Sequence, residues 1–164
     1  MTRIDVLPDD VLLEIFDFYV VLSLGDDQTG IEAWQQLVHV CRRWRFLVFE
    51  SPRRLNLRLL CTLERRIGRT LVSDVWPALP LVIEGIIDYS RIDMLPDMCN
   101  VMAALRQISR VSQVYLIGLT GWQFEDVFAA MQVPFPELTQ IKSDGEIDVP
   151  DIPDSFLGGS APRL

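Results

Sequence analysis

The residues that could carry out catalysis or bind a metal are scattered along the chain. His39 is the only histidine and lies two positions from Cys41, and helical positions two apart point to different faces. A catalytic nucleophile needs a base beside it and a third group that orients the base. The pattern therefore predicts a surface imidazole and a core thiol. Zinc would need four thiol or imidazole ligands in closely spaced pairs, but Cys61 and Cys99 also stand singly. We expect no catalytic site, no metal and no cofactor, and thus no enzyme.

An acidic segment and several glycines are the other candidates for ligand binding. Residues 144–154 hold five carboxylates, but glycine stands second rather than sixth and no glutamate closes a twelve-residue calcium loop. The glycines at 118, 121, 158 and 159 lack the lysine and the third glycine of a phosphate loop. The acidic segment is therefore interpreted as a solvated loop and the glycines as turn residues.

Composition and charge limit the classes of partner. The chain has 164 residues, of which 49% are hydrophobic, and a formal net charge of −8. This charge disfavours nucleic acid and anionic membranes. Nine arginines lie between residues 31 and 70 together with Trp44, Phe46 and Phe49. This stretch is interpreted as a solvated face whose positive charge complements the acidic segments. A nucleic-acid groove with stacking aromatic side chains is the alternative.

Cysteine usage and the apolar runs indicate the compartment. The three cysteines form neither a disulfide set nor a CxxC pair, which fits a reducing environment and predicts core thiols. No apolar run approaches the roughly 18 residues of a membrane helix. Acidic residues stand where a signal peptide would be apolar. We expect a protein of the cytoplasm, the nucleus or both, with no membrane partner.

Two helical segments are expected in the first third of the chain. Leu7-Pro8-Asp9-Asp10 is typical of a helix start, because proline suits the first turn and carboxylates suit the positive end of the helix dipole. Apolar residues at helical spacing continue to Tyr19. A second helix is predicted from Ile31 to Ser51, with apolar side chains on more than one face. A small module of this kind needs a partner for its second apolar side.

The remaining residues alternate between strand and helix patterns. Residues 78–83 are expected to form a short buried strand, residues 93–108 a helix, and residues 111–116 an alternating strand. A helix over residues 121–131 and a second strand core over residues 136–141 follow, in which Leu138 lies 27 residues after Val111. A period of 20–29 residues with a Leu-rich strand core is typical of leucine-rich repeats. A further repeat begins at residues 161–164, and since a solenoid needs a polar cap, we expect a truncated version of a longer protein.

The residues Leu7 to Phe16, followed by the segment from Leu37 to Leu47 with its Val-Cys-Arg-Arg-Trp run at residues 40–44, resemble the F-box motif. The segments at residues 74–80 and 157–164 resemble fungal F-box proteins with leucine-rich repeats. The fold expected from this resemblance is α+β, with a helical F-box-like module over residues 1–55, a connecting region over residues 56–110, and an incomplete leucine-rich-repeat-like solenoid over residues 111–164.

In the F-box family the module binds a Skp-type adaptor, and the repeats hold a protein substrate for a cullin-RING ubiquitin ligase. The resemblance thus implies a non-enzymatic substrate receptor of the ubiquitin conjugation pathway, with a Skp-type adaptor, a cullin-RING scaffold and a protein substrate as partners. The alternatives are a ligase-independent interaction scaffold or an arginine-rich nucleic-acid module. The adaptor-binding residues implied by the resemblance are Leu7, Pro8, Asp9, Leu12, Ile15, Phe16, Trp34, Leu37, Val40, Cys41 and Trp44.

Overall fold

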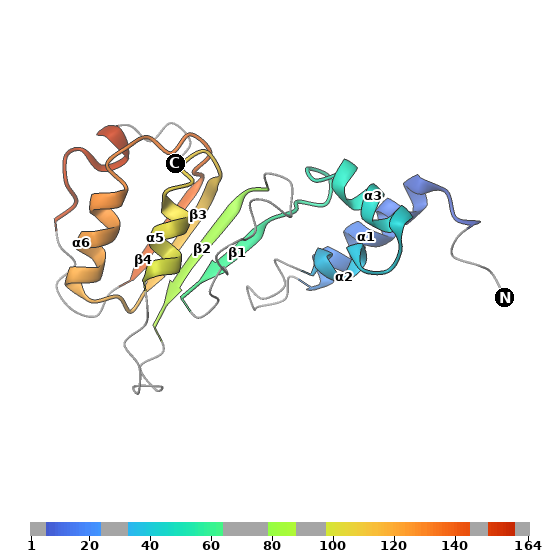
Figure 1. The fold of residues 1–164 in the computed structure, drawn as a ribbon, viewed down its shortest axis with the longest axis horizontal. Coiled ribbons are helices and arrows are strands. Elements are labelled where there is room, and N and C mark those ends of the chain that lie inside the picture. Colours follow the sequence, from blue (N-terminus) through green and yellow to red (C-terminus); the bar gives the residue numbers. More distant parts are fainter. Residues whose placement is uncertain (1–5, 24–32, 64–78, 88–97, 145–150, 160–164) are drawn as a thin grey trace. The chain divides into compact units, whose positions relative to one another are not determined.

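The structure, a computed structural model, describes residues 6–23, 33–63, 79–87, 98–144 and 151–159 (Figure 1). The chain divides into two compact units, Met1–Leu59 and Leu60–Leu164. The described residues form five α-helices and one four-stranded sheet. The fold is therefore of the mixed α and β class, as the sequence predicts.

The first unit contains three helices. Helix α1 spans Asp9–Ser23, α2 spans Trp34–Val38 and α3 spans Arg42–Glu50. The predicted start of α1 is confirmed, since the amide of Leu12 donates to the carbonyl of Pro8 at 3.1 Å and Asp9 and Asp10 occupy the first turn. The aspartates lie at the positive end of the helix dipole and favour this start.

The single helix expected from Ile31 to Ser51 is wrong, because the chain breaks between Val38 and Arg42. Cys41 has extended backbone angles of φ −157° and ψ 172° and precedes α3. This break lets α2 and α3 both turn apolar side chains inward, which one straight helix could not do. It also places Cys41 at the surface, and Cys99 is exposed too. The expectation of three core thiols holds for Cys61 only.

The core of the first unit is apolar and draws on every helix. The indole Nε1 of Trp34 donates to the carbonyl of Arg58 at 2.9 Å, so the polar atom of this fully buried ring is satisfied. The Trp34 ring also meets the Phe49 ring edge-on at 6.1 Å between centroids. The buried apolar side chains of this unit are Leu12, Phe16, Val20, Trp34, Leu37, Val38, Leu47, Val48, Leu55, Leu57 and Leu59.

The second unit is built on the sheet. Strands β1 (Leu59–Thr62), β2 (Leu81–Ile86), β3 (Val111–Ile117) and β4 (Gln140–Asp144) lie side by side in chain order. The pairs β2–β3 and β3–β4 are parallel. Gln113 pairs with Gln140, 27 residues later, which confirms the predicted offset. The sheet also takes in β1 and β2, which lie in the range 56–110 expected to connect the two parts of the chain. The strand predicted at residues 78–83 overlaps β2, whereas β1 was not predicted.

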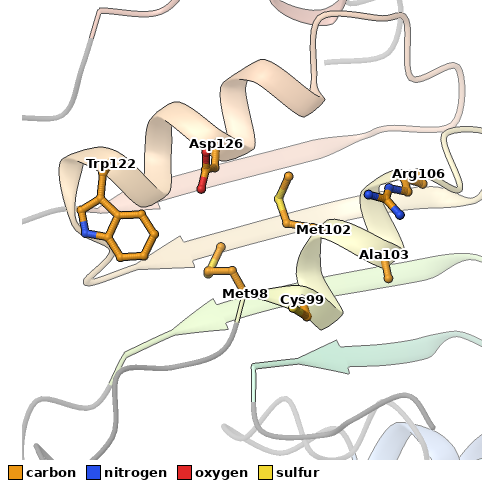
Figure 2. A pocket seen from close by; sticks show the side chains of 7 residues that line it. All are labelled: Met98, Cys99, Met102, Ala103, Arg106, Trp122 and Asp126. Carbon is orange, nitrogen blue, oxygen red and sulfur yellow. The ribbon is translucent and has the colours of Figure 1, made fainter. Parts of the chain in front are cut away.

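Helices cover one face of this sheet. In chain order, helix α5 (Cys99–Leu105) precedes β3, and helix α6 (Gly121–Ala130) follows β3 and precedes β4. Helix α5 contacts β2 and α6, and Figure 2 shows both helices over the strands. The strand at 111–116 and the helix at 121–131 are confirmed. The helix expected to include Ile108 ends earlier, at Leu105, and Ile108 is exposed.

Local interactions fix the start of α6 and the close packing of neighbouring elements in the second unit. Thr120 and Gln123 form a capping box at the start of α6, which satisfies amides that the first turn leaves unpaired. Gly85 of β2 allows a close approach, because a Cβ atom there would lie 3.0 Å from Cδ2 of Leu116. The thiol of Cys61 lies 3.5 Å from the carbonyl oxygen of Asn100 in α5. The Cys61 contact joins β1 to α5, and the Gly85 contact lies between β2 and β3.

The C-terminal described segment packs against α6. The 3-10 helix η4 (Phe156–Gly159) follows residues 151–155, and the amide of Leu157 donates to the carbonyl of Met131 at 2.7 Å. The Phe156 ring meets the Phe128 ring at 5.3 Å. Gly118, Gly158 and Gly159 have positive φ, in agreement with their prediction as turn residues. Gly121, predicted as a turn residue too, is instead the first residue of α6.

Some sequence predictions lie outside the described residues. These are the helix entry at 93–96, most of the acidic loop at 145–150, most of the family-like segment at 74–80, and the further repeat at 161–164. Within the described part of the chain, no helix is long and apolar enough to cross a membrane.

Candidate functional site

Arg43 joins the start of α1 to α3. Its guanidinium donates from Nη2 to the carbonyl of Leu7 at 2.6 Å and to Oδ1 of Asp9 at 2.5 Å, and from Nε to the same Oδ1 at 3.0 Å. A second ion pair joins Arg54 and Glu14. The two segments that carry the F-box resemblance are therefore in direct contact, although Asp9 and Arg43 are 34 positions apart.

Phe16 and Trp44 make a second contact between the same two segments. Their ring centroids are 4.6 Å apart with an angle of 57° between the planes. Phe16 is fully buried, and Trp44 is half-buried. Aromatic pairs at this distance contribute about 0.5–1.5 kcal/mol beyond the area that they bury. Trp44 thus ties α3 to the core face of α1.

The opposite side of α1 is apolar and exposed. Val11, Ile15, Phe18 and Leu22 are 38%, 43%, 66% and 65% exposed. Their spacing of four, three and four residues keeps them in one line along a helix. We call these four residues the α1 stripe. An apolar line of this length on a small unit is typical of a surface that binds another protein.

The eleven residues implied as adaptor-binding divide between the core and the surface. Leu12, Phe16, Trp34 and Leu37 are buried, so in this packing they support the unit from inside. Leu7 and Trp44 are half-buried, while Pro8, Asp9, Ile15, Val40 and Cys41 are exposed. Contacts bring together Leu7, Asp9 and Arg43, and separately Phe16 and Trp44. Only the exposed members, and part of the half-buried ones, can meet a partner without a change in packing.

The remaining members of the α1 stripe are not among those eleven residues. Val11, Phe18 and Leu22 share the line of Ile15 on the helix. Their helical spacing is visible in the sequence. Leu12 and Phe16 have the same spacing one position later, however, so the sequence alone does not show which set is exposed. Arg43 was also missed as a residue that positions the start of α1.

The arginine-rich stretch makes contacts within the first unit. Besides Arg43 and Arg54, the Nε of Arg45 donates to the carbonyl of Val38 at 3.0 Å, and the Nε of Arg58 donates to Oδ1 of Asn56 at 3.1 Å. Both ion pairs join this stretch to acids of α1. These contacts favour the interpretation that the arginines form a face whose positive charge complements the acidic N-terminal segment. The arginines at 65, 66 and 69 lie outside the described residues.

A second candidate surface lies between α5 and α6. A hollow of about 500 Å³ lies there. Figure 2 shows the side chains that line it, with Met102 extending from α5 toward α6 and Arg106 toward one end. Its lining combines thioethers and an indole with one guanidinium and one carboxylate, and Trp122 is half exposed. The full lining is Met98, Cys99, Met102, Ala103, Arg106, Trp122 and Asp126. Its chemistry suits an apolar side chain rather than a reaction.

Metal ligands do not gather in the described parts of either unit. No group of three or more His, Cys, Asp and Glu side chains lies close enough there to hold an ion. Comparisons of the chain with protein-family models, with curated proteins and with solved structures give no match. The geometry of the first unit is therefore the main guide to function.

Proposed function

We propose that this protein is a substrate receptor of a cullin-RING ubiquitin ligase, in which the first unit binds a Skp-type adaptor and the second unit presents a protein substrate. The observation that carries the proposal is the α1 stripe, an exposed apolar line on the helix whose start matches the Leu-Pro-Asp-Asp segment of the F-box motif. In this role the protein positions its partners and catalyses nothing itself.

The internal contacts of the first unit support this role. Arg43 binds both Leu7 and Asp9, and Trp44 packs on Phe16. The Cys-Arg-Arg-Trp segment therefore fixes the orientation of α1 and of the exposed side chains that it carries. Docking surfaces bind more tightly when they are held in the bound geometry beforehand. Buried Phe16 and Leu12 serve adaptor binding indirectly, through the position of the helix.

The exposed apolar area of α1 supplies part of the free energy that docking needs. Complete burial of a Val, Leu, Ile or Phe side chain contributes about 1.5–3 kcal/mol. The stripe residues are only partly exposed, so burial of the four together contributes about half of the full amount. Val40 and the methylenes of Pro8 add exposed apolar area nearby in the same unit. These contributions reach the lower end of the association cost of about 4–15 kcal/mol.

The topology of the second unit supports the role of a repeat-like substrate platform. Its strands follow one another in chain order, and a helix covers the same face at each described step between β2 and β4. A sheet of this order grows by adding one strand-helix unit at a time, as in a leucine-rich-repeat solenoid. The face of the sheet away from the helices carries Glu84, Tyr115 and Lys142 in register on neighbouring strands. This row offers a polar surface for recognition of a protein substrate.

Co-purification with a Skp-type adaptor tests the proposal. The full chain is expected to bind, and Phe18→Asp should abolish binding while the far-UV circular dichroism spectrum stays unchanged. Trp122→Asp is the matched control, because it places the same charge on a half-exposed aromatic position of the second unit. Equal binding by Phe18→Asp and the wild type, or no binding by the folded wild type, would refute the adaptor role. Adaptor binding without recruitment of a cullin would leave the protein as a ligase-independent scaffold.

A further inference from the structure

Strand β4 lies at one edge of the sheet in the second unit. It is the last strand in the order β1-β2-β3-β4, and within the described residues it pairs with β3 only. Ile141 is half-buried and the other four residues of the strand are exposed. An edge strand presents a row of backbone N–H and C=O groups to which another strand can add. The question is which strand this edge fits.

The hydrogen bonds to β3 show which backbone groups face outward. The amide of Gly118 donates to the carbonyl of Asp144 at 2.8 Å, next to the pair Ile117–Asp144. Because the direction of the backbone groups alternates along a strand, Lys142 and Asp144 bond toward β3. Ile141 and Ser143 then direct their N–H and C=O groups away from it. An added strand must match these two residues.

Three antiparallel registers of a second copy of β4 meet this condition. The register centred on Ile141 places Lys142 opposite the uncharged Gln140 and offers no charge pair, so two registers remain to be compared. One register is centred on Lys142 and places this residue opposite its own copy, where two like charges repel each other. The other is centred on Ser143 and places Lys142 of each copy opposite Asp144 of the other. Those positions are pairs without direct backbone bonds, in which the side chains approach most closely. Charge therefore selects the register centred on Ser143.

We propose that two copies of this chain associate through β4, antiparallel and centred on Ser143, with two reciprocal Lys142–Asp144 pairs. The two Ser143 residues exchange backbone hydrogen bonds, and the two sheets join into one. The argument for a second copy is the charge self-complementarity of the edge. The surface is separate from the α1 stripe and does not depend on the proposed function.

Charge reversal on β4 tests this association by sedimentation equilibrium. Lys142→Asp places an aspartate opposite Asp144 at both pairs and should weaken dimerisation about tenfold, because two attractive cross-strand pairs become repulsive. The double variant Lys142→Asp, Asp144→Lys restores opposite charges in the same register and should recover the wild-type dimer. The double variant is the matched control, since it changes the same position and retains the net charge of the wild type.

Chemical cross-linking gives an independent measurement. Lys142 is the only lysine of the chain, so a carbodiimide should link its amine to Asp144 of the second copy and give one dominant cross-linked peptide pair. A folded wild-type chain that stays monomeric at all concentrations would overturn the proposal. So would a dimer that Lys142→Asp leaves unchanged but Phe18→Asp abolishes, because that dimer would form through the α1 stripe.

Discussion

Two phenylalanines of α1 provide the sharpest test of the packing of the first unit. Phe16 is fully buried against Trp44, whereas Phe18, two positions later, is 66% exposed. Removal of a buried phenylalanine side chain costs about 3–5 kcal/mol, and loss of the aromatic pair adds about 0.5–1.5 kcal/mol. A core of fewer than about 70–80 residues rarely supplies more than about 3–5 kcal/mol. Phe16→Ala is therefore expected to unfold the first unit.

Hydrogen exchange measured by mass spectrometry can locate this effect. In Phe16→Ala, peptides from α1, α2 and α3 should lose protection, while peptides from β2, β3 and α6 keep it. Phe18→Ala is the matched control, because it removes the same side chain from the same helix at an exposed position. Such surface changes usually alter the free energy of unfolding by no more than about 0.5 kcal/mol.

Two results would contradict this reasoning. Similar protection in Phe16→Ala and Phe18→Ala would mean that the core face of α1 is assigned wrongly. Equal loss of protection in both units of Phe16→Ala would mean that they unfold as one, against the division of the chain at Leu59 and Leu60.

Three further predictions concern the second unit. Gly158→Ala should lower the free energy of unfolding by about 2 kcal/mol in a urea titration, because φ is +66° and the new Cβ would lie 2.8 Å from Pro134. Gly159→Ala, whose new Cβ would lie 3.8 Å from the carbonyl oxygen of Asp154, should cost about 1 kcal/mol from backbone strain alone in the same titration. Burial raises the pKa of the Glu84 carboxyl above its ordinary value of 4.5, so stability falls as the pH rises above that value; Glu84→Gln should melt at a higher temperature than the wild type at pH 7 and at nearly the same temperature below pH 4. Thr120→Ala removes the capping box of α6 and should cost about 1 kcal/mol in the same titration, whereas Thr120→Ser should cost much less.

Elements with strong local signals were predictable from the sequence. Pro8 and the two aspartates after it identify the start of α1, and alternation identifies β3. The helix predicted over residues 121–131 forms α6, and the structure adds Thr120 as its capping residue. The 27-residue offset reappears as the register between β3 and β4, although β4 begins only at Gln140 and residues 136–139 of the predicted strand core precede it. In each case a few neighbouring residues determine the backbone conformation.

Other elements depend on contacts that lie far apart in the sequence. The apolar pattern continues through residues 39–41, so nothing local indicates the break between α2 and α3. The break follows from the packing of both helices on α1. The first three residues of β1, Leu59–Cys61, are all apolar, and periodicity alone does not distinguish a buried strand from a buried helix. Its place beside β2 decides the matter.

The same limit applies to the candidate site. Leu12 and Phe16 have the helical spacing of Val11 and Ile15, and the sequence places both pairs in one broad apolar band. Only the packing of Trp44 on Phe16 and the contact between Arg43 and Asp9 determine which side of α1 faces the core. Once that side is fixed, Phe18 and Leu22 necessarily lie on the exposed side with Ile15.

Separate surfaces for stability, adaptor binding and self-association predict three separable phenotypes. Phe16→Ala should lose adaptor binding because the first unit unfolds, whereas Phe18→Asp should lose it with the fold intact. Lys142→Asp should change neither of these properties, since β4 belongs to the second unit. If Lys142→Asp weakened adaptor binding by the same factor as dimerisation, the adaptor would bind only the dimer, and avidity between two first units would explain the coupling.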